Sequence, residues 1–432
     1  MNSWDRGVIK TDKMGAMKRV ISALFGLSIV TAGLAESGFK LKAGDRVLFY
    51  GDSITEQHLY TNFVETFVVT RFPNLNVRFR NTGVGGDSVR GGWAGPIDLR
   101  LTRDFYPFRP TVATIMLGMN DGGYHPFDQP TFDAYSKGYS SIVEEVKKKL
   151  PGCKVMPILP SPYDDFAHKP NWDPGYNDVL VRFGQYLQQL AAKHKLETID
   201  LNSGVAGDLK KAAAIDSKLA EKLMPDRVHP TPQCQLLMAA ELLKAWGAPS
   251  TVTDVSIDLG SRKVNKASYT KVAIADGMSW TQLDERLPFP LSMEDPLVAL
   301  AMKSSDFLEK LNQEMLTVTG LTGSRYALKI DGKTVGEFTP AELESGINLA
   351  VLKTPMVAQA AKVKQLTDTH NSIFMARWRN VQMPFKSEPG LLNTESGMSK
   401  AIAGMEALEE DAVKAQHDAA KPVMHTFELV AR

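Results

Sequence analysis

The first half of the chain alternates short apolar runs with longer stretches whose apolar residues recur at helical spacing. Continuous apolar strands separated by helices are typical of a parallel sheet that is covered on both faces. We therefore expect an α/β domain with a parallel sheet of about five strands and helices on both faces. The expected strands are 47–50, 77–80, 112–117, 154–159 and 197–201, and the expected helices are about 58–71, 131–149, 177–195 and 232–246.

Three candidate site residues follow the ends of the first three expected strands. Ser53 comes after the first strand, Gly86 lies in the loop after the second, and Asn120 closes the third. In an open α/β sheet, ligands bind beyond the carboxyl ends of the strands. All three residues are therefore expected at one edge of the sheet, where they form a candidate site.

The sequence also supplies a base for Ser53. A serine hydroxyl is a poor nucleophile in water, and an adjacent neutral imidazole is its usual activator. His229 precedes Pro230, which disfavours the α region and predicts an extended or turn conformation at His229. Asp226, three residues upstream, is then expected to reach Nδ1–H and fix the tautomer, so that Nε2 is free to take the serine proton.

Gly86 and Asn120 are candidate donors to the negative charge that develops on an attacked carbonyl oxygen. No side chain covers the backbone N–H of Gly86, and Asn120 offers a side-chain amide at a strand end. Such donors stabilise the tetrahedral intermediate of acyl transfer. We expect Asp52 to have a structural hydrogen-bonding role beside the nucleophile.

Four segments of the chain, in order, resemble the signature blocks of the SGNH (GDSL-type) hydrolase superfamily, which includes esterases, lipases and carbohydrate deacetylases. The resemblance covers roughly 44–246 and implies a flavodoxin-like fold. One departure is Gln233-Cys234-Gln235, which stands where a glycine and a histidine are frequent. The four blocks are Gly51-Asp52-Ser53-Ile54-Thr55, Asn81-Thr82-Gly83-Val84-Gly85-Gly86-Asp87-Ser88, Gly118-Met119-Asn120-Asp121 and Asp226-Arg227-Val228-His229.

The resemblance implies that Ser53 is the nucleophile, His229 the general base and Asp226 its orienting acid. It also implies an oxyanion hole made of the Ser53 and Gly86 N–H groups and the Asn120 amide. We expect a carboxylic ester hydrolase that needs no metal ion and no organic cofactor.

Two other classes of protein stay open. A metal-dependent phosphoesterase usually needs several histidine ligands, and only one histidine lies in a motif here. A non-catalytic sugar-binding protein on the same fold is disfavoured by the complete set of catalytic residue types. The candidate ligands of a two-metal centre are Asp52, Asn120, Asp121, Asp226 and His229.

The N-terminus predicts export. Lys18 and Arg19 precede the apolar segment 20–35, which ends in small residues at Ala32-Gly33-Leu34-Ala35. A basic flank, an apolar segment of this length and a small-residue end are typical of a secretory signal peptide. We expect cleavage after Ala35 and a secreted or periplasmic protein without a stable membrane span.

Beyond Ala248 the pattern changes to short strands mixed with helices. We expect domains at 36–250 and 251–432, the second a smaller α+β accessory or cap region. Its expected helices are 296–315, 354–382 and 399–419, and Asp331-Gly332 is expected to turn a hairpin. Packing at a domain interface is the favoured interpretation of Arg377-Trp378-Arg379, ahead of sugar binding. His370 is expected on a helix surface.

Composition limits the partners. The formal net charge of the chain is +1, and Lys and Arg form no basic stripe, so nucleic acid is not expected as a partner. An ester on a small molecule or polysaccharide is the expected substrate, with O-acetyl groups on carbohydrate first. Trp93 and Tyr124 are candidate residues for stacking on a sugar ring. The oligomeric state, and whether Cys153 and Cys234 pair, stay open.

Overall fold

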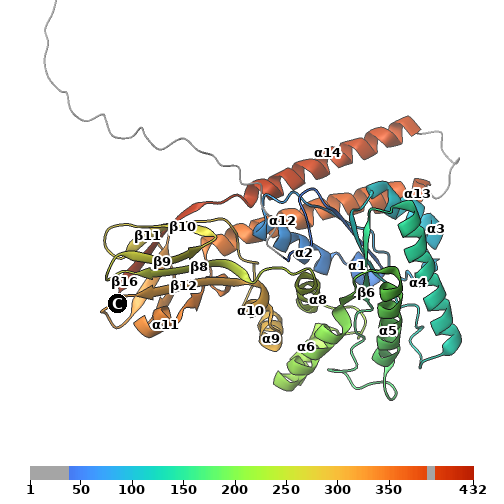
Figure 1. The fold of residues 1–432 in the computed structure, drawn as a ribbon, viewed down its shortest axis with the longest axis horizontal. Coiled ribbons are helices and arrows are strands. Elements are labelled where there is room, and N and C mark those ends of the chain that lie inside the picture. The colour runs from blue at the N-terminus through green and yellow to red at the C-terminus, as the bar shows by residue number, and fades with distance from the viewer. Residues whose placement is uncertain (1–37, 387–394) are drawn as a thin grey trace, which may run out of the picture. The chain divides into compact units, whose positions relative to one another are not determined.

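In the computed structural model, which describes residues 38–386 and 395–432, the first half of the chain forms a five-stranded sheet (Figure 1). The strand order is β2-β1-β5-β6-β7, and all neighbouring strands are parallel. The expected α/β fold is confirmed. The strands are β1 (Arg46–Gly51), β2 (Arg78–Asn81), β5 (Val112–Met116), β6 (Lys154–Leu159) and β7 (Ile199–Asp200).

Helices cover both faces of this sheet, which is why its central strands are apolar throughout. Every residue of β5 is buried, as are all but the first of β6. One pair of packed helices is α2 with α8, and another is α4 with α5. The main helices are α2 (Leu59–Arg71), α4 (Gln129–Lys149), α5 (Tyr176–His194), α6 (Leu201–Ile215) and α8 (Pro232–Ala245).

The strand order places a topological switch between β1 and β5. The chain runs from β1 outward to β2, and then crosses to β5 on the other side of β1. Loops diverge at such a point and leave a crevice beyond the carboxyl ends of the strands. Ser53 follows β1 and Asn120 follows β5, so both lie at this crevice.

Short elements connect the main ones in the first half of the chain. A four-residue helix, α1, follows β1 directly, and a small β-ribbon of β3 and β4 lies between β2 and β5. The short elements are α1 (Ser53–Glu56), β3 (Gly91–Gly92), β4 (Gly95–Pro96), α3 (Ile97–Arg100), a π-helical turn (Leu101–Phe105), a 3₁₀ turn (Tyr106–Phe108), α7 (Ser217–Ala220) and a 3₁₀ turn (Glu221–Leu223).

The second half of the chain contains two further sheets, of five and four strands, whose buried side chains form a shared core. Their strands alternate buried and half-buried or exposed residues, as expected when one face of a sheet is covered. The sheets are β10-β11-β16-β13-β14 and β15-β12-β8-β9. The strands are β8 (Thr251–Asp258), β9 (Lys263–Ser268), β10 (Thr270–Ile274), β11 (Ser279–Asp284), β12 (Gln313–Thr319), β13 (Tyr326–Ile330), β14 (Lys333–Phe338), β15 (Ile347–Asn348) and β16 (Met424–Ala431).

The hairpin expected at Asp331-Gly332 is confirmed by the antiparallel pairing of β13 and β14. The single helix expected over 296–315 is wrong. The chain instead forms α9 (Pro296–Ser304) and α10 (Phe307–Leu311) and then enters β12 at Gln313. Buried and half-buried residues alternate over 313–319, and Leu316 and Val318 complete the sheet core, so burial outweighs the helical spacing there.

Helices α9 and α10 belong to the same hydrophobic core as the parallel sheet, through Leu300, Phe307 and Leu311. The boundary expected at 250/251 stays a prediction. The other short elements of this half are α11 (Pro340–Ser345), a 3₁₀ turn (Leu349–Val351) and α13 (Met383–Lys386).

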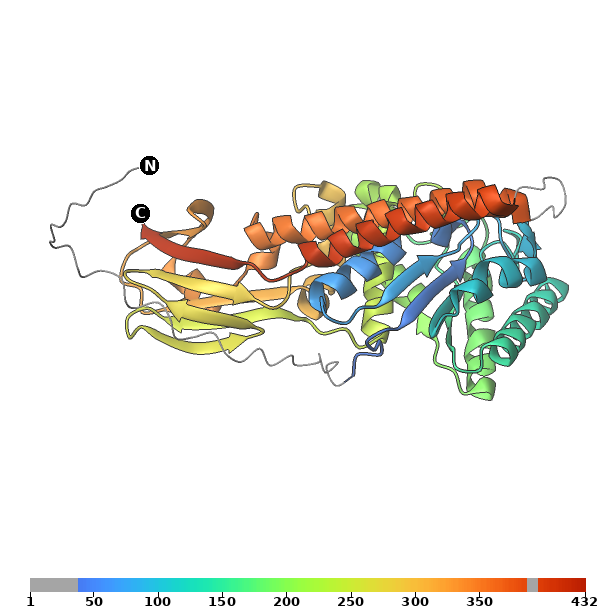
Figure 2. The same cartoon turned by 90° about the horizontal axis from the view of Figure 1, so that it is seen from above.

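Two long helices run antiparallel from the two sheets of the second half along the parallel sheet of the first half (Figure 2). They are α12 (Pro355–Met375), which continues into a π-helical segment, η5 (Ala376–Gln382), and α14 (Glu395–Ala419). Thr354 caps α12, and Pro355 occupies its first position, as expected. His370 of α12 is buried and hydrogen-bonded to Glu65 of α2, so its expected surface position is wrong.

Candidate active site

Ser53 lies at the first position of α1, directly beyond the carboxyl end of β1. The Asp52 side chain caps this helix, since its Oδ1 accepts a hydrogen bond from the Ile54 N–H at 3.0 Å. Within the described residues, the Ser53 N–H has no hydrogen-bond acceptor. The strand holds the hydroxyl in place, and the helix start leaves a free donor beside it.

A chain of hydrogen bonds connects Ser53 to a carboxylate. Ser53 Oγ lies 2.9 Å from His229 Nε2, and His229 Nδ1 lies 2.7 Å from Asp226 Oδ2. The other Asp226 oxygen accepts from the backbone N–H groups of Val228 and His229, at 3.0 and 2.7 Å. This is the geometry in which an imidazole accepts a serine proton while a carboxylate fixes its tautomer.

The environment of Asp226 keeps it ionised. Partial burial favours the neutral acid, but the hydrogen bonds from the His229 backbone, the His229 ring and the Val228 backbone outweigh it and lower the pKa of Asp226. An ionised carboxylate stabilises the imidazolium that forms when His229 takes a proton.

Gly86 and Asn120 stand beside this chain as the two other expected donors. Gly86 has a φ of +76°, a conformation that glycine adopts at little cost, and its N–H donates to no group within the described residues. Asn120 Nδ2 donates one hydrogen to the Asp87 carbonyl at 2.9 Å, which leaves its second hydrogen for a ligand.

Tyr124 holds the Asn120 amide from the other end. Its hydroxyl donates to Asn120 Oδ1 at 3.1 Å, so the amide cannot exchange its oxygen and nitrogen without losing both bonds. Burial, followed by the charges of Asp52 and Asp226, raises the pKa of Tyr124 to about 12 and keeps the donor protonated. The structure gives Tyr124 a positioning contact, and its expected role in sugar stacking stays a prediction.

Of two acids beneath the site, Asp52 is buried and Asp121 is half-buried. Burial and the nearby charge of Asp121 raise the pKa of Asp52 to about 7, although the Ile54 N–H offsets part of that shift. Burial also raises the pKa of Asp121 to about 6, against the hydrogen bond from the Val89 N–H. Each side chain accepts a hydrogen bond from a backbone N–H group, so these contacts stabilise the local backbone.

Trp93 is 64% exposed, more than any other large hydrophobic side chain among the described residues. Its Nε1 donates to the Gly85 carbonyl at 2.8 Å, which fixes the ring next to the Gly86 loop. The ring therefore stands at the rim of the site in a defined orientation.

The sequence reasoning assigned no role to two residues that shape this loop. Glu56 accepts from the Gly85 N–H at 2.7 Å, and Asn81 accepts from the Gly83 N–H at 2.9 Å. Asn81 also donates to the Thr55 carbonyl and so ties the loop to α1. Asn81 is the first residue of the second sequence block, so its position in a motif could have indicated a role in the site. Glu56 lies outside all four blocks, and no sequence motif pointed to it.

Arg377 and Trp378 are buried, which fits packing better than sugar binding, and the expected position of this segment at a domain interface stays a prediction. Trp378 is buried, and its Nε1 donates to Asp104 Oδ1 at 2.7 Å. It packs in one cluster with Val84 and Ala94, which flank the Gly86 loop in sequence.

The part of the chain that the structure describes shows no metal-binding cluster and no membrane-crossing helix. Residues 38–386 and 395–432 contain no group of three or more His, Cys, Asp or Glu that is placed to hold a metal ion. In the same ranges, no helix has the length and apolar character that a bilayer crossing needs. Cys153 and Cys234 are free thiols, and burial raises the pKa of Cys153 to about 12.

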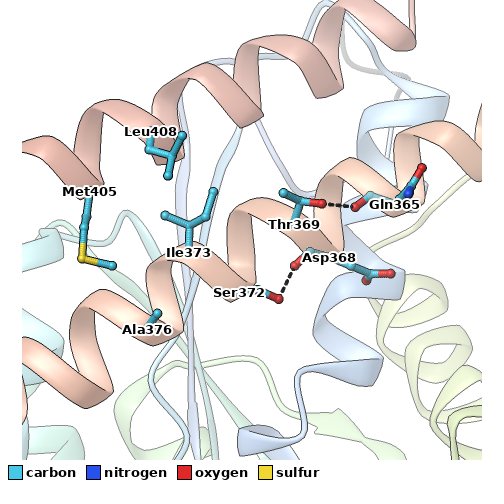
Figure 3. A pocket seen from close by; sticks show the side chains of 8 residues that line it. All are labelled: Gln365, Asp368, Thr369, Ser372, Ile373, Ala376, Met405 and Leu408. Carbon is cyan, nitrogen blue, oxygen red and sulfur yellow. Dashed lines mark hydrogen bonds between the residues drawn. The ribbon is translucent and has the colours of Figure 1, made fainter.

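A hollow of about 500 Å³ lies between α12 and α14 (Figure 3). Its hydroxyl groups are turned to their own helix: Thr369 donates to the Gln365 carbonyl and Ser372 to the Asp368 carbonyl. Met405 and Leu408 supply part of its apolar lining. None of the catalytic candidates lines this hollow.

Residues 49–235 match the model of the GDSL-like lipase/acylhydrolase family. This part of the chain is a GDSL-type (SGNH) hydrolase domain, as the four sequence blocks predicted. The family match, together with the sequence similarity to an acetylxylan esterase given below, makes the chain a carboxylic ester hydrolase.

An acetylxylan esterase from Geobacillus stearothermophilus is 24% identical over 230 residues, which are 48% of this chain and 96% of that protein. A solved structure of a gut microbial diltiazem-metabolizing enzyme has 27% identity and a TM-score of 0.80, and the match covers 91% of this chain and 98% of the other. A catalytic mutant of an acetylxylan esterase from Geobacillus stearothermophilus has 24% identity and a TM-score of 0.39 over 48% of this chain and 96% of the other.

Proposed function

We propose that the protein is a serine esterase that removes O-acetyl groups from carbohydrates through an acyl-enzyme intermediate. The observation that carries the mechanism is the hydrogen-bonded chain Ser53–His229–Asp226, with donors free at the edge of the sheet beside it. The support for the substrate is the similarity to an acetylxylan esterase and the exposed ring of Trp93 at the rim.

The first half of the reaction acylates Ser53. Its Oγ attacks the ester carbonyl carbon while its proton passes to His229 Nε2. The Ser53 N–H, the Gly86 N–H and the free Asn120 hydrogen then donate to the oxyanion. The tetrahedral intermediate collapses by breaking the bond to the alcohol oxygen, which takes the proton from the imidazolium and leaves.

The second half of the reaction frees the enzyme. Water attacks the acetyl carbon and gives a proton to His229, and the same donors hold the second oxyanion. When this intermediate collapses, Ser53 Oγ takes back a proton from the imidazolium and acetate departs. The serine proton thus leaves with the alcohol, and a proton from water replaces it on Ser53.

The test is hydrolysis of a series of p-nitrophenyl esters from acetate upward, and of acetylated xylo-oligosaccharides, by the wild type in excess EDTA and by Ser53→Ala. We expect EDTA-resistant release of acetate, a fall in kcat/KM with longer acyl chains, and no turnover by the variant. Diltiazem, the compound that the structural neighbour metabolizes, serves as a non-carbohydrate comparison substrate.

Three outcomes would contradict parts of this proposal. Equal activity of Ser53→Ala would remove the serine mechanism, and activity lost to EDTA would favour the metal-dependent alternative. Turnover of the p-nitrophenyl acetate without any release of acetate from oligosaccharides would remove the carbohydrate substrate.

We also propose that the protein is exported, on the basis of the basic pair Lys18-Arg19 and the apolar segment 20–35. This segment lies outside the described residues. N-terminal sequencing of the protein from cells that express the full gene should find Glu36 as the first residue, and an uncleaved N-terminus would contradict the proposal.

A further inference from the structure

Arg379 lies in the π-helical segment η5, more than 300 residues beyond the nucleophile in sequence, yet it contacts the rim of the site. Its Nη1 lies 2.7 Å from Glu56 Oε1, at an ion-pair distance without the angle of a hydrogen bond. Its guanidinium carbon lies 4.2 Å from the centre of the Trp93 ring. The Arg379 and Glu56 side chains are 25% and 23% exposed, so solvent screens this pair less than one on the open surface.

The two partners of Arg379 hold the two polar groups of one residue, Gly85. Glu56 Oε2 accepts from the Gly85 N–H at 2.7 Å, and Trp93 Nε1 donates to the Gly85 carbonyl at 2.8 Å. Arg379 bridges these two side chains. Through them it is linked to the loop that carries the proposed oxyanion donor, Gly86.

The carbonyl of Gly85 and the N–H of Gly86 belong to the same peptide group. In a trans peptide the N–H points away from the C=O, so the bond from Trp93 to the carbonyl also sets the direction of the Gly86 N–H. Glycines at 85 and 86 leave this peptide free to rotate unless other groups hold it. A side chain that fixes Trp93 therefore fixes an oxyanion donor.

The charge of Arg379 has a second effect. The Glu56 carboxylate lies next to the loop, and an unpaired negative charge there would oppose the negative charge of the oxyanion. The guanidinium offsets that charge while leaving one carboxylate oxygen bonded to the Gly85 N–H.

The segment that carries Arg379 is itself anchored behind the loop. Trp378 donates to Asp104 Oδ1, and Asp104 pairs with Arg100. Arg100 donates to the Asp87 side chain at 2.8 Å and to the Thr82 carbonyl at 2.7 Å. All of these side chains are buried, so η5 is attached to both ends of the loop 82–87.

We propose that Arg379 is a positioning residue of the active site, which holds the Gly85–Gly86 peptide in its donating orientation through Trp93 and Glu56. This rests on the proposed function, and it gives the C-terminal helices a part in catalysis. Arg379 touches no reacting atom and acts only through its two partners.

The test compares Arg379→Ala, Arg379→Lys and the double variant Arg379→Ala/Glu56→Gln on p-nitrophenyl acetate. Arg379→Ala should lower kcat about tenfold with little change in KM, less than the 10²–10³ lost with a whole donor. The double variant should recover part of that loss, because the neutral amide still accepts from Gly85 without an unpaired charge. A merely structural arginine would show no such recovery.

Arg78→Ala is the matched control. Arg78 also pairs across to the C-terminal helices, with Glu410 of α14, but it lies at the amino end of β2, away from the catalytic edge. We expect its kcat to stay at the wild-type value. An Arg379→Ala enzyme with wild-type kcat, or one whose loss the double variant does not relieve, would overturn the proposal.

Hydrogen–deuterium exchange over residues 82–93 separates this proposal from the esterase proposal. Faster exchange in Arg379→Ala, together with an inactive wild type, would uphold the positioning role and contradict the esterase. Unchanged exchange would contradict the positioning role whatever the activity. If Arg379→Ala does not fold, Arg379→Lys decides the matter: it keeps the charge but loses the planar stack on Trp93, and an unchanged kcat would overturn the proposal.

Discussion

The chain contains two helix starts that are locally alike, Asp52-Ser53 and Asp216-Ser217. In each, an aspartate side chain caps a four-residue helix and a serine takes the first helical position. Ser53 follows a buried strand and lies 2.9 Å from a histidine nitrogen. Ser217 is exposed, and in the described part of the chain it contacts no histidine.

The difference shows that the local motif positions a serine at a helix start but does not make that serine reactive. A cap needs only a short polar side chain before the helix, whatever surrounds it. Activation needs a base, an acid that orients it and donors for the oxyanion, and for Ser53 three other segments of the chain supply these groups. The surroundings also separate the two caps, since Asp52 is buried and Asp216 is exposed.

The largest contrast is expected in covalent labelling. A fluorophosphonate reacts with an activated serine through the same attack and the same oxyanion donors as an ester. The wild type and Ser217→Ala should each gain one label at Ser53, whereas Ser53→Ala should gain none. Intact-mass spectrometry and peptide mapping give the result. A label on Ser217 would contradict the statement that only Ser53 of the two serines is activated.

A smaller contrast concerns the side-chain donor that accompanies Ser53. Asn120→Ala should lower kcat by roughly 10²–10³ on p-nitrophenyl acetate, since one oxyanion donor is lost. Tyr124→Phe serves as the control, because it removes only the hydroxyl that holds Asn120 Oδ1 and should cost a few-fold. Steady-state kinetics of both variants decide this, and a larger loss in Tyr124→Phe than in Asn120→Ala would exclude the assigned donor.

A third contrast concerns the dependence of stability on pH. The pKa of Asp52 is raised to about 7 in the folded protein, from about 4 in an unfolded chain. The folded state therefore binds the proton more tightly, and the free energy of unfolding falls as pH rises between these values, by at most about 1.4 kcal/mol per pH unit. Asp52→Asn removes this loss, so its melting temperature relative to the wild type should climb from pH 4 to pH 7.

Thermal unfolding across that pH range provides the measurement, with Asp216→Asn as the control for a cap substitution at an exposed site. The amide can still accept from the Ile54 N–H, so the cap itself is retained. A constant difference between Asp52→Asn and the wild type at every pH would show that Asp52 is not buried as the structure has it.

The neighbourhood of Asp331-Gly332 shows where sequence patterns were sufficient. Turn residues between alternating strands predict a hairpin because both signals act within a few residues, and β13 and β14 form as expected. The stretch 296–315 shows the opposite. Its apolar residues fit a helix, but the last of them complete a sheet with β8 and β15, partners far away in sequence.

The sequence alone determined the parallel sheet, the edge at which Ser53, Gly86 and Asn120 gather, and the pairing of Asp226 with His229. These follow from strand periodicity and from residues three apart, which are local properties. Only the tertiary structure decided that His370 is buried against Glu65 and that Arg379 contacts Glu56 and Trp93. Those contacts join residues about 300 positions apart, and they arise from how α12 and η5 pack against the hydrolase domain, which no local pattern encodes.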